Sequence, residues 1–67
     1  MIEILLNGKK TKFENQLTIT QLIERYQLDI KKIAVEKNLE IIEPSKFSQI
    51  TIDQGCVIEI IHFIGGG

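Results

Sequence analysis

The short length of the chain sets the tightest limit on its fold. With 67 residues it can form a single domain around one small core, and a domain of this size buries only about 60% of the surface that the unfolded chain exposes. Ordering the residues costs on the order of 100 kcal/mol, and the core that offsets this cost is small. We therefore expect no multidomain arrangement, no large enzyme and no enclosed cofactor cavity.

The composition favours a β-rich protein in the cytoplasm. Fourteen Ile and two Val are β-branched residues, which suit a pleated, half-buried surface. The net charge of −1 predicts no non-specific nucleic-acid binding, which requires clustered cations. No apolar run approaches the roughly 20 residues that span a bilayer, and the N-terminal residues do not form a secretory signal. The single Cys56 cannot form an intramolecular disulfide, whereas small secreted domains usually carry several.

A β-hairpin is predicted at the start of the chain. The apolar side chains of residues 2–6 fall mainly on one face of a strand. Asn7-Gly8 follows, and this pair is the best suited to the positive φ angles of a tight hairpin turn. Residues 10–13 then form the returning strand.

The next element is a helix that begins after Thr18. Thr18 is a preferred N-cap, and Gln21 lies three positions later, as in a capping box. Leu17 and Leu22 flank this start and can form a hydrophobic staple. Apolar residues at helical spacing form one stripe, consisting of Ile19, Leu22, Ile23 and Tyr26.

Further strands are predicted at residues 33–37, 40–42 and 57–63. Between the last two, Phe47 is expected to pack inward from a loop or a single helical turn. A hairpin, a helix and later strands indicate an α+β fold, with a mixed sheet of four or five strands packed on one main helix. The first and last strands are expected at the centre of this sheet.

The residue types that catalysis needs are nearly absent. One His and one Cys leave no nucleophile and base pair, and no paired Cys or His spacing suits a metal ion. The glycine run at residues 65–67 has no helix after it, so it is not a phosphate-binding loop. We expect no catalytic residue, no metal site, no bound cofactor and no enzymatic activity.

Three glycines, Gly65, Gly66 and Gly67, follow the last strand. Without side chains they can enter a narrow channel and adopt backbone angles that other residues avoid. The carboxylate of Gly67 is then unhindered for activation, typically as a mixed anhydride with a nucleotide. The alternative is an incidental chain end, disordered or left from cloning, and the tail alone does not decide between the two.

The alternation of the last strand predicts an apolar patch on the outside. If Ile58 and Ile60 face the helix, Ile61 and Phe63 face outward, next to Leu5 where the first and last strands pair. Contiguous exposed apolar surface usually marks a partner site. We predict a partner interface of Leu5, Ile61, Phe63 and Ile64; an opposite register or scattered surface residues would be the alternative.

Other distinctive residues have simpler interpretations. His62 is expected to be a packed or hydrogen-bonded residue near the strand end, and Cys56 an inert small residue. The lysines of the first hairpin are expected to form a solvated edge that discourages edge pairing: Lys9, Lys10 and Lys12.

A pattern over nearly the whole chain is typical of one protein family. It comprises residues 1–13, Leu17-Thr18-Ile19, residues 33–38, Pro44 and above all IEIIHFIGGG at residues 58–67. This pattern resembles the ThiS family, the sulfur carriers of thiamine biosynthesis. The resemblance implies a ubiquitin-like β-grasp domain at residues 1–64 and a flexible glycine tail at residues 65–67.

The resemblance also implies a carrier role. The Gly67 carboxylate would be adenylated with ATP by a ubiquitin-activating-type adenylyltransferase and converted to a thiocarboxylate with sulfur supplied through a cysteine desulfurase. Thiazole synthase would take this sulfur, and Gly65 and Gly66 would thread the partner site. Two turns depart from the family pattern, with Gly55-Cys56 in place of Gly-Asp and Asn38-Leu39-Glu40 in place of Asn-Gly-Glu.

Three alternative functions remain open at this point. The first is a molybdopterin synthase small subunit, which shares the fold and the Gly-Gly end but is generally longer. The second is a ubiquitin-like modifier joined to lysines through Gly67, and the third is an interaction module whose tail is incidental.

Overall fold

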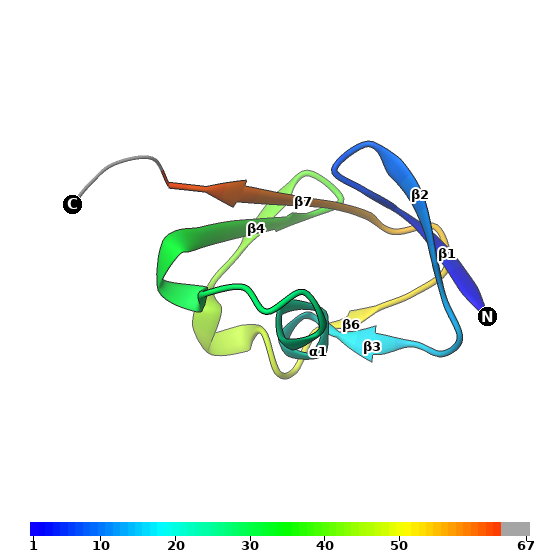
Figure 1. Ribbon diagram of the computed structural model, residues 1–67, viewed down its shortest axis with the longest axis horizontal. Helices are drawn as coiled ribbons and strands as arrows, with labels where there is room; N and C mark the ends of the chain where they lie inside the picture. Colours follow the sequence, from blue (N-terminus) through cyan, green and yellow to red (C-terminus); the bar gives the residue numbers. More distant parts are fainter. Residues whose placement is uncertain (64–67) are drawn as a thin grey trace.

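The computed structural model describes residues 1–63, which form a sheet curved over one helix (Figure 1). Within these residues the main sheet has five strands in the order β2-β1-β7-β4-β5, and a second pair joins β3 to β6. The elements in chain order are β1 (Ile2–Leu6), β2 (Lys9–Phe13), β3 (Leu17–Thr18), α1 (Ile19–Arg25), the 3-10 turn η1 (Ile30–Lys32), β4 (Ile33–Lys37), β5 (Glu40–Ile42), the 3-10 turn η2 (Pro44–Lys46), β6 (Thr51–Ile52) and β7 (Val57–His62).

The first and last strands lie side by side in the middle of the sheet, as predicted. β1 pairs with β7 in parallel, with Leu5 opposite Val57 and Leu6 opposite Ile58. β7 pairs with β4 in antiparallel on its other edge, so the sheet is mixed. The strand that leads to the chain end is therefore hydrogen-bonded along both edges.

The predicted helix start is confirmed. The Thr18 hydroxyl accepts a hydrogen bond from the Gln21 amide at 3.1 Å, and the Gln21 side chain accepts one from the Thr18 amide at 2.8 Å. The helix ends without glycine: Gln27 adopts φ +55°, and its amide donates to the Glu24 carbonyl while the Leu28 amide donates to the Ile23 carbonyl. This pair of bonds is a Schellman motif with glutamine in the left-handed position.

The core lies between the sheet and α1. Leu17 and Leu22 are both buried, and Phe47 is almost completely enclosed, as predicted. The buried set is Ile2, Ile4, Phe13, Leu17, Ile19, Leu22, Ile23, Ile33, Val35, Phe47, Ile52, Cys56 and Ile58. Within residues 1–63 no helix is long and apolar enough to cross a membrane.

Two short strands were not predicted. β3 and β6 contain two residues each and pair Leu17 with Ile52 and Thr18 with Thr51. Two residues are too few to show an alternating pattern, so the sequence gives no signal for them. Their pairing fixes the segment that leads into α1.

Both tight hairpin turns use left-handed backbone. Asn7 and Gly8 between β1 and β2 have φ angles of +49° and +81°, and Asn38 and Leu39 between β4 and β5 have +52° and +72°. Positive φ at both central residues defines the type I′ turn, which matches the twist of the flanking strands. In Figure 1 both turns rise beside β7 on the side away from α1.

Candidate functional site

The centre of the sheet anchors the segment that leads to the chain end. β7 stays paired with β4 as far as His62, which lies opposite Ile33. One residue later, the Phe63 amide still donates to the Lys32 carbonyl at 2.9 Å. The predicted site residues Ile64, Gly65, Gly66 and Gly67 lie outside the described residues.

The outer face of the sheet exposes the apolar side chains expected there. Leu5 and Ile61 are 38% and 46% exposed, whereas Ile58 is buried and Ile60 packs against the core. The predicted register of β7 is therefore confirmed, because a shift by one residue would exchange its two faces. The predicted adjacency of Leu5 and Ile61 is wrong. Leu5 lies opposite Val57 at the start of β7, whereas Ile61 lies near its end, opposite Ala34 of β4.

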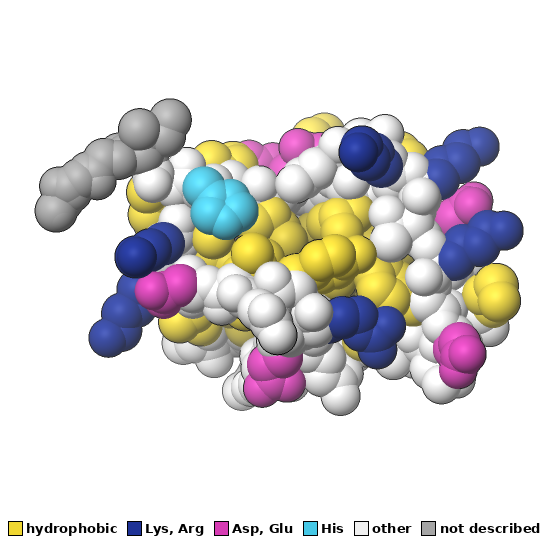
Figure 2. All heavy atoms as spheres, in the orientation of Figure 1, with side chains coloured by type: hydrophobic (Ala, Val, Ile, Leu, Met, Phe, Trp, Pro, Cys, Tyr) yellow, Lys and Arg dark blue, Asp and Glu magenta, His cyan; other side chains and the backbone are white. Residues whose placement is uncertain are grey.

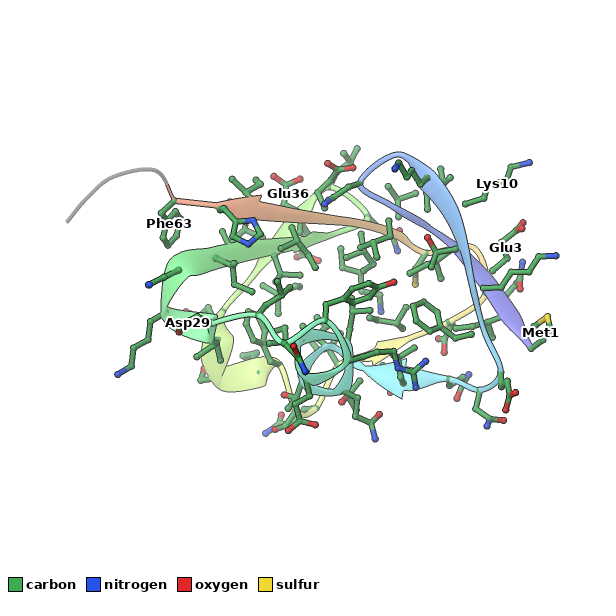
Figure 3. The ribbon with its side chains drawn as sticks, in the orientation of Figure 1. Met1, Glu3, Lys10, Asp29, Glu36 and Phe63 are labelled. Atoms are coloured by element: carbon green, nitrogen blue, oxygen red, sulfur yellow. The ribbon has the colours of Figure 1, made fainter. Side chains whose placement is uncertain are left out.

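Phe63 is exposed but does not continue this outer row. Its side chain is 62% exposed, and Figure 3 shows it below the end of β7, whereas Glu36 lies above the ribbon. Strand alternation ends with β7 at His62, so it no longer fixes the direction of the next side chain. Phe63 instead lines an open apolar hollow of about 540 Å³ with Ile30, Ile33 and other residues.

Two exposed apolar residues on the β4–β5 hairpin were missed by the sequence analysis. Leu39 at the turn is 87% exposed and Ile41 is 70% exposed. Ile41 lies opposite Glu36, and Glu36 lies opposite Glu59 of β7, so these three residues form one row across the sheet. The alternation of residues 40–42 could have indicated that Ile41 points away from the core.

The predicted environment of His62 is wrong, because its side chain is exposed. It borders an open hollow of about 340 Å³ with Tyr26, Leu28 and Ile60 among its other walls. Figure 2 shows hydrophobic side chains gathered in the middle of this face, with the cyan His62 beside them. The alternation of β7 places His62 on the helix side, but it lies at the strand end, where the core is no longer closed.

The described residues offer no constellation for metal or nucleophilic chemistry. Residues 1–63 contain no group of three or more His, Cys, Asp or Glu that could hold a metal ion. Cys56 is buried, and its sulfur accepts a hydrogen bond from the Asp53 amide at 3.3 Å. Of the features described in residues 1–63, the exposed outer face beside the base of the chain end is therefore the best candidate for a functional surface.

Comparison with known proteins identifies the family. The family model of ThiS matches residues 3–67, almost the entire chain. The chain belongs to the ThiS family. It is 43% identical over 63 residues to the sulfur carrier protein ThiS of Bacillus subtilis, and this match covers 92% of the chain and 96% of the relative.

A solved ThiS structure confirms the predicted fold class. The crystal structure of the thiamine biosynthesis protein ThiS from Geobacter metallireducens superposes with a TM-score of 0.86 at 28% identity, covering 98% of this chain and all of that one. The fold is thus the ubiquitin-like β-grasp fold of ThiS, with a mixed five-stranded sheet on one helix within the described residues.

Longer relatives contain a ThiS-like stretch inside a larger polypeptide. The thiazole synthase of Paramagnetospirillum magneticum is 36% identical over 66 residues, and that of Magnetococcus marinus is 30% identical over 66 residues. Each match covers 98% of this chain but only 20% of the thiazole synthase. Both relatives are named thiazole synthase, and each contains a ThiS-like stretch within its longer chain.

Proposed function

We propose that this protein is a sulfur carrier of thiamine biosynthesis, acting in the cytoplasm as a substrate of other enzymes and not as a catalyst. The similarity to Bacillus subtilis ThiS carries the proposal, because it extends over nearly the full length of both chains. The simple chemistry of the described residues fits this role, since a carrier needs a surface and an end group but no catalytic residues of its own.

The proposed reactive group is the carboxylate of Gly67. A carboxylate is a poor electrophile, so a ubiquitin-activating-type adenylyltransferase joins it to AMP from ATP and releases pyrophosphate. A persulfide supplied through a cysteine desulfurase then attacks the carbonyl carbon and displaces AMP, which gives an acyl disulfide. Attack of a second thiol on this disulfide releases the thiocarboxylate and leaves a disulfide between the two donor thiols. The carrier itself holds no cofactor, and ATP belongs to the activating partner.

The rest of the glycine tail has a steric role in this proposal. Gly65 and Gly66 pass through a partner channel that is too narrow for a side chain, with backbone angles that glycine alone adopts readily. β7 supports this role because it is hydrogen-bonded to β1 and β4 along its edges. The last described residues before the glycines, at the end of β7, are therefore fixed in the middle of the sheet.

The proposed partner interface combines the outer face of the sheet with the residues that follow β7. Leu5 and Ile61 are the exposed apolar residues of the central strands, and the proposal adds Phe63 at the sheet end and Ile64 beyond it. The partners are the adenylyltransferase and a thiazole synthase, which takes the sulfur for the thiazole ring. The ThiS-like stretches within two thiazole synthases support the second partner.

Intact mass spectrometry of the protein from its native cells tests the carrier role. We expect a fraction of the molecules to carry one sulfur in place of one oxygen, located at Gly67 by fragmentation. Protein conjugates on a denaturing gel would instead indicate a modifier, and co-purification with a molybdopterin synthase large subunit would indicate the other sulfur carrier class.

Deletion of Gly67 tests the end group in isolation. The deletion should abolish ATP–pyrophosphate exchange by the adenylyltransferase and leave the melting temperature unchanged, because the buried core of the described residues is formed between Ile2 and Ile58. An unchanged exchange rate would contradict the proposed site. Replacing Lys46 by Ala, in the exposed turn η2, provides a control that should keep the full exchange rate.

A further inference from the structure

The turn between β4 and β5 places a leucine where the backbone favours glycine. Leu39 has φ +72°, a left-handed conformation in which the β-carbon of an L-residue approaches the following carbonyl. For a bulky residue this is an outlier. The side chain gains almost nothing from the core in return, because it is 87% exposed.

A second unfavourable feature lies on the same hairpin. Glu36 of β4 is directly opposite Glu59 of β7 on the outer face, and like charges in this position destabilise a sheet. Both carboxylates belong to half-buried residues. The neighbour of Glu36 on its other edge is Ile41, which is 70% exposed.

These features form one continuous surface. The Asn38 amide donates to the Val57 carbonyl at 2.7 Å, so the Leu39 turn lies against the start of β7. Glu59 and Ile61 follow along the outer face of the same strand. Figure 3 shows Glu36 on this side of the sheet, away from α1.

The surface reaches the base of the chain end. β7 contains six residues from Val57 to His62, which span about 17 Å at the usual rise of a strand. A partner that accepts the tail and also contacts Leu39 must therefore cover the whole outer face. The turn, the carboxylate pair and the tail-side residue Ile61 are parts of one proposed interface.

We propose that Leu39 and Ile41, together with Glu36 and Glu59, form the part of this interface that docks onto thiazole synthase. The matching surface on the synthase offers an apolar pocket to Leu39 and arginine or lysine side chains to the two carboxylates. The two facing carboxylates favour a partner with a basic surface, because a cation between them removes their repulsion. Backbone strain and facing like charges lower stability, and such unfavourable features cluster at binding sites.

The choice of thiazole synthase rests on the proposed function and on the longer relatives. In two thiazole synthases the ThiS-like stretch is part of the same chain, so these relatives hold the two units together covalently. The exposed outer face of the carrier would serve the same association. An exposed leucine in a left-handed turn is a rigid anchor for that purpose.

Calorimetric titration of the purified synthase with Leu39→Ala and Leu39→Gly tests the anchor. Both variants should bind at least about tenfold more weakly than the unchanged carrier, because an interface anchor is lost. Leu39→Ala keeps the left-handed strain, so its melting temperature should stay the same. Leu39→Gly relieves the strain, and its melting temperature should rise by about 4 °C.

Gln27→Gly is the matched control. Among the described residues at positive φ, Gln27 and Leu39 are the two that are neither glycine nor asparagine. Gln27 is exposed and lies at the end of α1, away from the outer face. This variant should also raise the melting temperature, but it should bind the synthase with unchanged affinity. Glu36→Gln should weaken binding several-fold at low salt, with a smaller loss at high salt.

The outcomes separate this inference from the proposed function. Unchanged affinity of Leu39→Ala, with the sulfur-bearing form present in cells, would overturn the docking surface and leave the carrier role intact. A loss of affinity for the adenylyltransferase alone would overturn the assignment of the partner. If the unchanged carrier failed to bind the synthase at all, both this inference and the proposed partner would be wrong.

Discussion

The two β-hairpins of this small sheet have the same design and differ in two details. Each turn begins with an asparagine at positive φ, Asn7 in the first and Asn38 in the second. Each asparagine side chain accepts a hydrogen bond from a β7 amide, at 2.7 Å from Ile60 and at 2.8 Å from Val57. The central strand therefore holds both turns in the same way.

The differences all make the second hairpin less favourable. Gly8 occupies the second turn position of the first hairpin, and Leu39 occupies it in the second. In the first hairpin Glu3 lies opposite Lys12, whereas Glu36 next to the second turn lies opposite Glu59. One hairpin follows the local rules of stability, and the other breaks them on a surface that we assign to binding.

Among the variants of the two hairpins, loss of either asparagine side chain should change the free energy of unfolding the most. Asn7→Ala and Asn38→Ala each leave a β7 amide without its acceptor and place alanine at positive φ. The free energy of unfolding should fall by about 1–3 kcal/mol in each case, measured by urea denaturation. Asn7→Gly and Asn38→Gly keep the backbone freedom and should lose less; equal losses for alanine and glycine would mean that the turn geometry adds nothing.

Leucine in the first turn should reproduce the strain of the second. Nothing lies within 4 Å of a β-carbon built on Gly8, so Gly8→Leu meets no clash and the cost comes from the backbone alone. We expect a loss of about 1–2 kcal/mol in the free energy of unfolding. A negligible loss would show that left-handed leucine is easily tolerated, and the argument from strain at Leu39 would fail.

Much of the fold follows from local signals in the sequence. Asn7-Gly8 indicated the first turn, and Thr18 with Gln21 indicated the helix start, because each signal depends on neighbouring residues alone. The register of β7 followed from its alternation, since Ile58 must be buried and Ile61 must not. Strands β3 and β6 were missed because two residues carry no period.

The sequence could not show that the exposed residues of the second hairpin and Glu59 of β7 share one surface. Asn38-Leu39 lacks the glycine that signals a type I′ turn, so the left-handed leucine is visible only in the structure. The facing of Glu36 and Glu59 depends on the pairing of β4 with β7, which are separated by two other strands in the sequence. The direction of Phe63 depends on where β7 ends, and strand ends are the least certain part of a prediction.

Glycine in the second turn should make the two hairpins alike. Leu39→Gly removes the strain of the left-handed backbone, but it also gives the unfolded chain more freedom. The net gain in the free energy of unfolding should be about 0.5–1 kcal/mol, smaller than the loss caused by Gly8→Leu. Urea denaturation measures both values, and a destabilised Leu39→Gly variant would mean that the leucine side chain contributes to folding.

Removing one charge of the facing carboxylates should have the smallest effect. Glu36→Gln replaces a repulsive pair on the outer face, and the free energy of unfolding should rise by about 0.2–0.5 kcal/mol at low salt. The gain should shrink as salt screens the remaining charges. Lys12→Gln in the first hairpin is the mirror-image control, because it removes an attraction to Glu3 and should lower stability by a similar amount. If both variants shift stability in the same direction, cross-strand charge does not distinguish the two hairpins, and the carboxylate pair loses its place in the docking argument.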